Sequence, residues 1–137
     1  MKATELRIGN LGYDVINGRD VSILGINSTW NDVWVRYLNG SADYKIDVND
    51  FVPHKLTEDW LLRFGFEKDE YNENVYTLDS FDICFGWGFG ENENHWHYAY
   101  DFEKGDGYSC LWKAIDFVHQ LQNLYFALTG EELEINN

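Results

Sequence analysis

Two histidines, a cysteine and a carboxylate occur close together in the segment 82–102, and these residue types could do chemistry. His95 and His97 are two residues apart, so on a β-strand both imidazoles would lie on one face and could reach the same metal ion. Cys84 could act as a thiol nucleophile if one of these histidines took its proton and Asp101 oriented that histidine. A metal-binding or thiol-dependent enzyme centred on these four residues is therefore one hypothesis for this chain.

Both forms of this chemistry lack a specific signal. The two histidines supply two ligands where a closed zinc site needs four, although Glu91, Glu93 or Asp101 could add oxygen ligands. The acidic surroundings would raise the pKa of a thiol, whereas reactive cysteines generally lie near positive charge. We therefore expect a structural or solvated histidine pair, no cofactor and no catalysis, and keep the enzyme as the alternative.

The elements that must position these residues are strands, because polar and apolar residues alternate through the segment. FDICFGWGF (81–89) and HWHYAYDF (95–102) fit two strands of a hairpin with its turn at 90–94, and NENVYTL (72–78) fits a third strand. The alternation places Asp82, Cys84, His95, His97 and Asp101 on a polar face. The opposite face receives an apolar row of Trp96, Tyr98, Tyr100 and Phe102.

The first part of the chain consists of short strand patterns separated by turn signals. Asn17-Gly18 and Asn39-Gly40 are typical of tight hairpins, and the strands around them predict a small antiparallel barrel, such as an SH3-like one, or a curled sheet. After Pro53, Thr57 is a helix N-cap for the short segment TEDWLLRF, and Gly65 is a natural end for that helix.

The C-terminal segment IDFVHQLQNLYFALTG (115–130) has helical spacing and a wide apolar face, which we expect to pack against the second sheet. The sequence therefore predicts an α+β protein, mostly antiparallel β, with a barrel lobe at 1–54 and a lobe of sheet and helix at 55–137. The two lobes could also form one compact domain.

The charge is unevenly distributed along the chain. The net charge is −14, and residues 66–137 hold 15 acidic and 3 basic residues against 9 and 7 in residues 1–65. Such acidity disfavours direct binding to nucleic acid, because affinity for a phosphate backbone depends on cations. A basic surface on another protein is the partner that this charge would attract.

The cysteines and the hydropathy of the sequence indicate the cellular compartment in which the protein is expected. Two cysteines without a CxxC spacing cannot form a disulfide framework or a zinc knuckle, so a reducing setting is the default. The segment MKATELRIGN lacks the apolar run of a signal peptide, and no stretch of the sequence is apolar for long enough to cross a bilayer. The sequence thus predicts a cytoplasmic protein without membrane contact.

Three stretches of the chain are similar to a known group of sequences. ELRIGN (5–10), LTEDWLLRFGF (56–66) and VHQLQNLYFALTGEEL (118–133) together resemble a group of small uncharacterised proteins from bacterial genomes, prophages and phages. The resemblance implies an accessory protein of a phage or other mobile element and gives no catalytic residue.

Surface recognition is the function that these observations favour. Exposed rings beside carboxylates suit the binding of Arg and Lys, because a ring face attracts the cation while the acid pairs with it. We expect a non-enzymatic protein-binding protein, in its sharpest form an inhibitor of a host nucleic-acid-handling defence protein of the anti-CRISPR or anti-restriction type. The expected partner-binding residues are Glu67, Asp69, Glu70, Glu73, Trp87, Glu91, Glu93, Trp96, Tyr98, Tyr100, Asp101 and Glu103.

Overall fold

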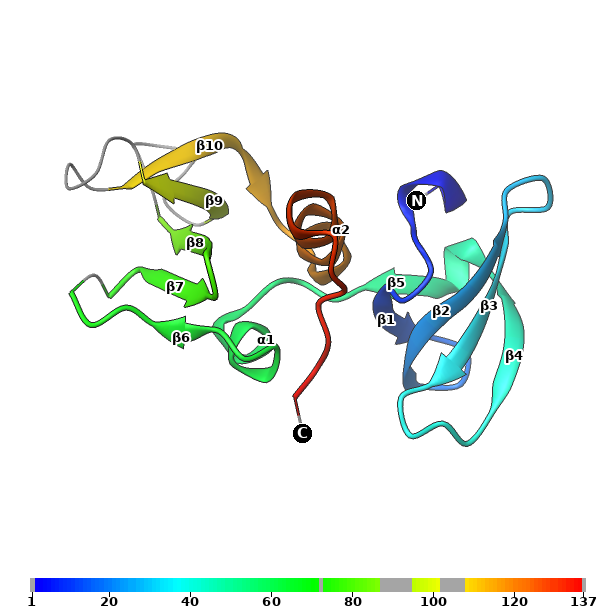
Figure 1. Cartoon of the computed structure of the whole chain (residues 1–137). Coiled ribbons are helices and arrows are strands. Elements are labelled where there is room, and N and C mark those ends of the chain that lie inside the picture. Colours follow the sequence, from blue (N-terminus) through cyan, green and yellow to red (C-terminus); the bar gives the residue numbers. More distant parts are fainter. Residues whose placement is uncertain (1, 72, 87–94, 102–107, 137) are drawn as a thin grey trace. The chain divides into compact units, whose positions relative to one another are not determined.

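The fold consists of two antiparallel sheets and two α-helices (Figure 1). The structure, a computed structural model, describes residues 2–71, 73–86, 95–101 and 108–136, and for residues 100, 101 and 108–113 the backbone alone. The predicted α+β class with mostly antiparallel strands is confirmed. The chain divides into a first unit, Met1–Lys55 with Phe117–Glu132, and a second unit, Leu56–Asp116 with Leu133–Asn137.

The first unit contains a five-stranded sheet with the order β4-β3-β2-β1-β5. The last strand returns to pair with the first, as expected for the small SH3-like barrel that the sequence predicts. Both Asn-Gly pairs lie in hairpin turns, with φ of 66° at Gly18 and 74° at Gly40, a conformation that glycine adopts at little cost. The elements are η1 (Ala3–Glu5), β1 (Leu11–Asp14), β2 (Arg19–Asn27), β3 (Asp32–Tyr37), β4 (Asp43–Asp47), η2 (Val48–Asp50) and β5 (Phe51–Pro53).

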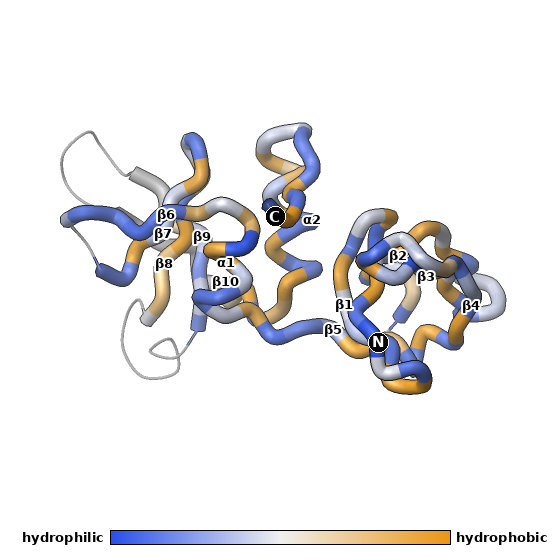
Figure 2. The backbone as a smooth tube through the Cα atoms, turned by 90° about the horizontal axis from the view of Figure 1, so that it is seen from below, coloured by the Kyte–Doolittle hydropathy of each residue, from blue (hydrophilic) through white to orange (hydrophobic). Residues whose placement is uncertain are grey.

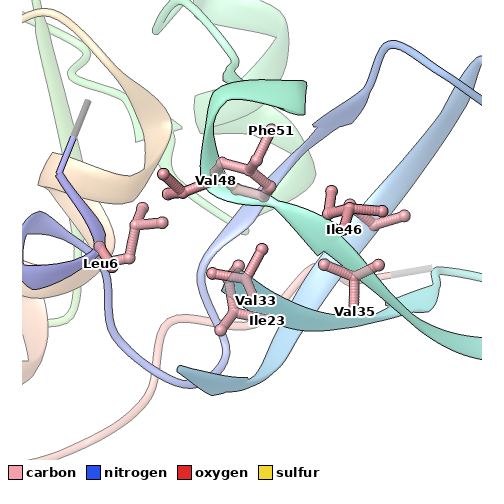
Figure 3. Packing of buried hydrophobic residues seen from close by; sticks show 9 residues of the cluster. Leu6, Ile23, Val33, Val35, Ile46, Val48 and Phe51 are labelled. Carbon is pink, nitrogen blue, oxygen red and sulfur yellow. The ribbon is translucent and has the colours of Figure 1, made fainter. Parts of the chain in front are cut away.

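Aliphatic side chains from one face of this sheet form the core of the first unit. Val33 and Val35 on β3 are fully buried, while Trp34 between them is exposed, which is the alternation of a strand with one face in the core. Figure 2 shows hydrophobic and hydrophilic residues interspersed along the chain of the first unit. Figure 3 shows the cluster, which includes Leu6, Ile23, Val33, Val35, Ile46, Val48 and Phe51.

A buried carboxylate ties the β1–β2 turn to β4. Asp14 is fully buried and accepts hydrogen bonds from the backbone N–H of Ile16 (2.9 Å), from the Asn17 side chain (2.7 Å) and from the Tyr44 hydroxyl. Burial alone would raise the pKa of Asp14, but the hydrogen bonds from Tyr44, Asn17 and the backbone outweigh it and lower the pKa. The same burial and the bond to Asp14 raise the pKa of Tyr44.

The C-terminal helix α2 (Val118–Thr129) belongs to the first unit, which corrects the expectation that it packs against the second sheet. Gln122 accepts a hydrogen bond from the backbone N–H of Leu11 (2.8 Å) and donates one to the carbonyl of Gly9 (3.0 Å). The segment before β1 therefore satisfies its backbone groups on α2. Apolar spacing alone could not predict these polar contacts.

The second unit contains the sheet with the order β10-β9-β8-β7-β6. Its three central strands are the three that the sequence predicts, whereas the outer strands β6 and β10 are additional. Thr57 caps α1 by accepting a hydrogen bond from the N–H of Trp60, as expected. The elements are α1 (Glu58–Arg63), β6 (Glu67–Lys68), β7 (Val75–Leu78), β8 (Phe81–Phe85), β9 (Trp96–Asp101) and β10 (Tyr108–Ile115).

Aromatic rings form much of the core of the second unit. Trp96 packs against Phe85 and Tyr76, with ring centroids 4.8 and 5.5 Å apart, and Phe81 packs against Tyr98 at 4.9 Å. Burial and a hydrogen bond to Glu58 raise the pKa of Tyr76 to about 12.

Among the described residues, neither helix is long and apolar enough to cross a membrane.

Candidate functional site

The turn between β6 and β7 combines carboxylates with an exposed ring. We call Glu67, Asp69, Glu70, Tyr71 and Glu73 the acidic turn. Glu67, Glu70 and Glu73 are exposed, and Figure 2 shows the segment as hydrophilic. Tyr71 is 95% exposed, which is the highest value among the large apolar side chains that the structure describes.

Backbone hydrogen bonds give this turn a defined shape. The N–H of Asp69 donates to the carbonyl of Val75 (2.9 Å), and the Asp69 carboxylate accepts a hydrogen bond from the N–H of Tyr71 (3.1 Å). Asp69 thus positions the residue that presents the ring. Within the described part of the chain, no lysine or arginine forms an ion pair with a carboxylate of the acidic turn.

The rings that the sequence assigned to partner binding lie differently. Trp96 is 8% exposed and packed between other rings, so its predicted role as an exposed binding residue is wrong. Tyr98 is half-buried against Phe81. The reason is that β8 and β9 pair with Phe85 opposite Trp96, so their apolar rows form one inner face. Trp87, Glu91, Glu93 and Glu103 lie outside the described residues, as do the side chains of Tyr100 and Asp101.

The predicted polar face of β8 and β9 is buried. Cys84 lies opposite His97 in the strand register, as expected, but Cys84 is 5% exposed and His97 is fully buried. Val75 and Ala99 pack beside Cys84 on this face. Of the two forms expected for the histidine pair, structural or solvated, His97 has the structural one, because apolar residues of neighbouring strands share its face.

Cys84 is disulfide-bonded. A disulfide sulfur is not a thiolate, so the structure leaves no nucleophile for the thiol-dependent hypothesis at this position. The cytoplasmic location stays a prediction.

His95 is separated from His97 by its different surroundings. It is half-exposed, and its Nδ1 lies 2.8 Å from a carboxylate oxygen of Asp116. Such a pair orients an imidazole, but among the described residues no group of three His, Cys, Asp or Glu side chains could hold a metal ion. The described residues of the hairpin therefore do not form the metal cluster of the alternative hypothesis.

Sequence reasoning missed the most exposed rings. Tyr71 stands among acidic residues, and only that polar context could have indicated its exposure. Trp30 and Trp34, both in the first unit, are 73% and 50% exposed. The position of Trp34 between Val33 and Val35 predicts its outward orientation, because alternate residues of a strand face opposite ways.

No protein-family model matches this chain, and neither does any curated protein or any solved structure.

Proposed function

We propose that this protein is a non-enzymatic binding protein whose acidic turn docks on a basic surface of another protein. The observation that supports the proposal is Tyr71, which is 95% exposed in a turn with four carboxylates. Folding buries almost none of the Tyr71 ring, so nearly all of its surface is available to a partner. Tyr is also among the residues that interfaces favour.

The chemistry of the acidic turn matches lysine and arginine. A cation over a phenol ring is attracted by the ring's quadrupole, and a neighbouring carboxylate adds an ion pair that orders the contact. The net charge of −14 would also steer a basic partner toward the protein over distances of about 10 Å, the screening length at 0.1 M salt. The same charge repels a phosphate backbone.

The finer form of the proposal is an accessory protein of a phage or other mobile element that acts in the cytoplasm. Its partner would be a host nucleic-acid-handling defence protein, which it would inhibit in the manner of an anti-CRISPR or anti-restriction protein. This form is supported by the sequence resemblance and by the basic surfaces that nucleic-acid-handling proteins present. An acidic protein could occupy such a surface in place of nucleic acid.

A pull-down from bacterial lysate with immobilised protein tests the proposal. We expect basic partners that are retained at low salt and lost as ionic strength rises, because exposed ion pairs are screened. The variants Tyr71→Ser and Glu70→Gln/Glu73→Gln should retain less of the same partners. The double variant Asp79→Asn/Glu134→Gln removes two exposed charges of the second unit outside the acidic turn and is the matched control. Equal retention by all variants would contradict a role for the acidic turn.

A further inference from the structure

The outer face of β2, β3 and β4 presents an ordered set of side chains to solvent. Trp34 on β3 lies opposite Gly25 on one side and Lys45 on the other. Two residues along, Asp32 lies between Asn27 and Asp47. We call this set (Asn27, Gly25, Asp32, Trp34, Lys45 and Asp47) the tryptophan face. It belongs to the first unit and is distinct from the acidic turn.

The indole of Trp34 is exposed because its neighbours do not cover it. A Cβ atom at Gly25 would lie 3.8 Å from the Cβ of Trp34, in ordinary van der Waals contact, so a larger residue would pack beside the ring. Glycine leaves that place open, and φ at Gly25 is not in the left-handed region that would require glycine. On the other side, Lys45 pairs with Asp32 at 3.7 Å. The ring therefore remains 50% exposed.

The charges of this face are incompletely balanced. Asp32 and Asp47 are directly opposite in the register, an arrangement of like charges that destabilises a sheet. Lys45 is the one cation within ion-pair distance of either carboxylate among the described residues, and it reaches Asp32. Asp47 accepts a hydrogen bond from the backbone N–H of Asn49 (2.8 Å) and is exposed. A second cation would be attracted to this pair.

Elsewhere in the chain, arginine guanidinium groups lie over aromatic rings. Arg63 lies 4.1 Å from the centroid of Trp60, and Arg7 lies 4.2 Å from that of Phe126. Among the described residues, no cation lies over Trp34 in this way. Trp34 thus offers the best ring type for such a contact and has no cation of its own.

We propose that the tryptophan face binds an arginine-bearing segment of a partner protein, with one guanidinium stacked on Trp34 and paired with Asp47 or Asp32. Residues two apart on a strand are roughly 7 Å apart, a span that one arginine side chain covers. Arginine suits the site better than lysine, because its planar group stacks on an aromatic face and still pairs with a carboxylate. The inference rests on the proposed function, since it assumes a basic partner, but it uses a separate surface.

Three synthetic peptides test the inference on the full chain. One is a nonapeptide of alternating arginine and threonine, one replaces each arginine by lysine, and one replaces it by the neutral isostere citrulline. Binding is followed by the indole N–H resonance of Trp34, assigned with Trp34→Phe, and by the anisotropy of a labelled peptide. We expect the arginine peptide to shift this resonance most, the lysine peptide less, and the citrulline peptide not at all.

Substitutions on the face sharpen the test. Trp34→Ala should weaken binding of the arginine peptide roughly fivefold, the usual worth of a partly exposed cation–ring contact. Gly25→Val should weaken it similarly while Trp34 is retained, because the added side chain covers the ring. Asp47→Asn removes the charge and keeps an oxygen for the N–H of Asn49. Trp30→Ala removes another exposed indole outside the face and is the matched control.

The outcomes separate this inference from the proposed function. Loss of binding in Trp34→Ala and Gly25→Val, with Trp30→Ala unchanged, supports the tryptophan face. If Tyr71→Ser loses binding and the face variants do not, the inference fails and the proposed function stands. A Trp34 resonance that moves with protein concentration alone identifies a second copy as the occupant and overturns the inference. An equal response to the citrulline peptide overturns it as well, because the charge is then irrelevant.

Discussion

The two units differ in where they place their rings and their charges. The first unit has 9 acidic and 6 basic residues and exposes Trp30 and Trp34 at 73% and 50%. The second unit has 15 acidic and 4 basic residues, and Tyr71 is the one fully exposed ring among its described residues. Negative charge and exposed rings therefore coincide in the acidic turn and not, as far as the structure describes it, in the hairpin of β8 and β9.

The cores differ as well. The first unit buries aliphatic side chains together with polar groups that are hydrogen-bonded, such as Asp14 and Gln122. The second unit buries aromatic rings that pack edge-on or tilted around Trp96. A small sheet can thus be stabilised by satisfied polar contacts or by ring area, and different substitutions should break each unit.

The largest effect is expected from Trp96→Ala. Removing a large buried ring costs roughly 3–5 kcal/mol of unfolding free energy, because it loses transfer energy and leaves a cavity. Near-UV circular dichroism and amide resonances of the variant should show a destabilised second unit while resonances of the first unit persist. Trp34→Ala, at an exposed ring, is the control. Simultaneous loss of both units would show that they unfold as one domain and would weaken the comparison.

Asp14→Ala should be the most damaging change among the polar residues of the first unit, at about 3 kcal/mol. It leaves the donors of Tyr44, Asn17 and Ile16 without the acceptor that the buried Asp14 provides. A double-mutant cycle with Tyr44→Phe, measured by urea unfolding, gives the coupling between the two side chains. Additive effects would contradict a direct contribution of the Tyr44 hydrogen bond.

Protonation of Asp14 should likewise destabilise the first unit of the wild-type protein. The folded pKa of Asp14 is lower than the ordinary value of 3.8, so its contribution is fully present above that value and is lost as pH falls through the folded pKa. Acid unfolding of the first unit below about pH 4 should therefore be less steep in Asp14→Ala than in the wild type. Equally steep acid unfolding in the two proteins would show that Asp14 does not control the acid unfolding of the first unit.

Local signals in the sequence were sufficient for the class of fold and several boundaries. The Asn-Gly pairs fixed two hairpins, Thr57 fixed the start of α1, and Gly130, with φ of 76°, ends α2. Each of these depends on a residue and its immediate neighbours. Alternation also placed Trp96 and Phe85 on one face, as the strand register confirms.

Long-range relations could not be read in the same way. The partner of α2 depends on Gln122, whose hydrogen bonds reach 111 and 113 residues along the chain. His97 lies in register with Cys84 and Val75 of the neighbouring strands, and Asp14 is hydrogen-bonded to Tyr44. Residue type alone does not predict burial at these places, because charged and polar side chains are buried only when distant partners satisfy them.

A smaller effect is expected from His119 on α2. Its side chain is 4% exposed and stacks on Phe117, and burial lowers its pKa although Glu5 acts in the opposite direction. As pH falls below the ordinary value of 6.5, the unfolded chain takes up the proton first, so stability present above pH 6.5 is lost. The slope is at most about 1.4 kcal/mol per pH unit.

Urea unfolding of the first unit between pH 7.5 and pH 5, as test conditions, checks this prediction at roughly half-unit steps. His119→Gln should have a flatter dependence on pH than the wild type. His95→Gln, a substitution in the second unit, is the matched control and should keep the wild-type slope. The same slope in His119→Gln would show that another group causes the loss of stability.

The smallest effect on stability is expected from Tyr71→Ala, within about 0.5 kcal/mol of the wild type. The ring is 95% exposed, so its removal uncovers almost no apolar surface and opens no cavity. Thermal unfolding of the second unit should give the same midpoint for both proteins. A clearly lower midpoint would show that the ring packs on the fold in solution. The second unit would then have no freely exposed ring among its described residues, and the contrast between buried rings that stabilise the fold and rings exposed to solvent would lose its clearest case.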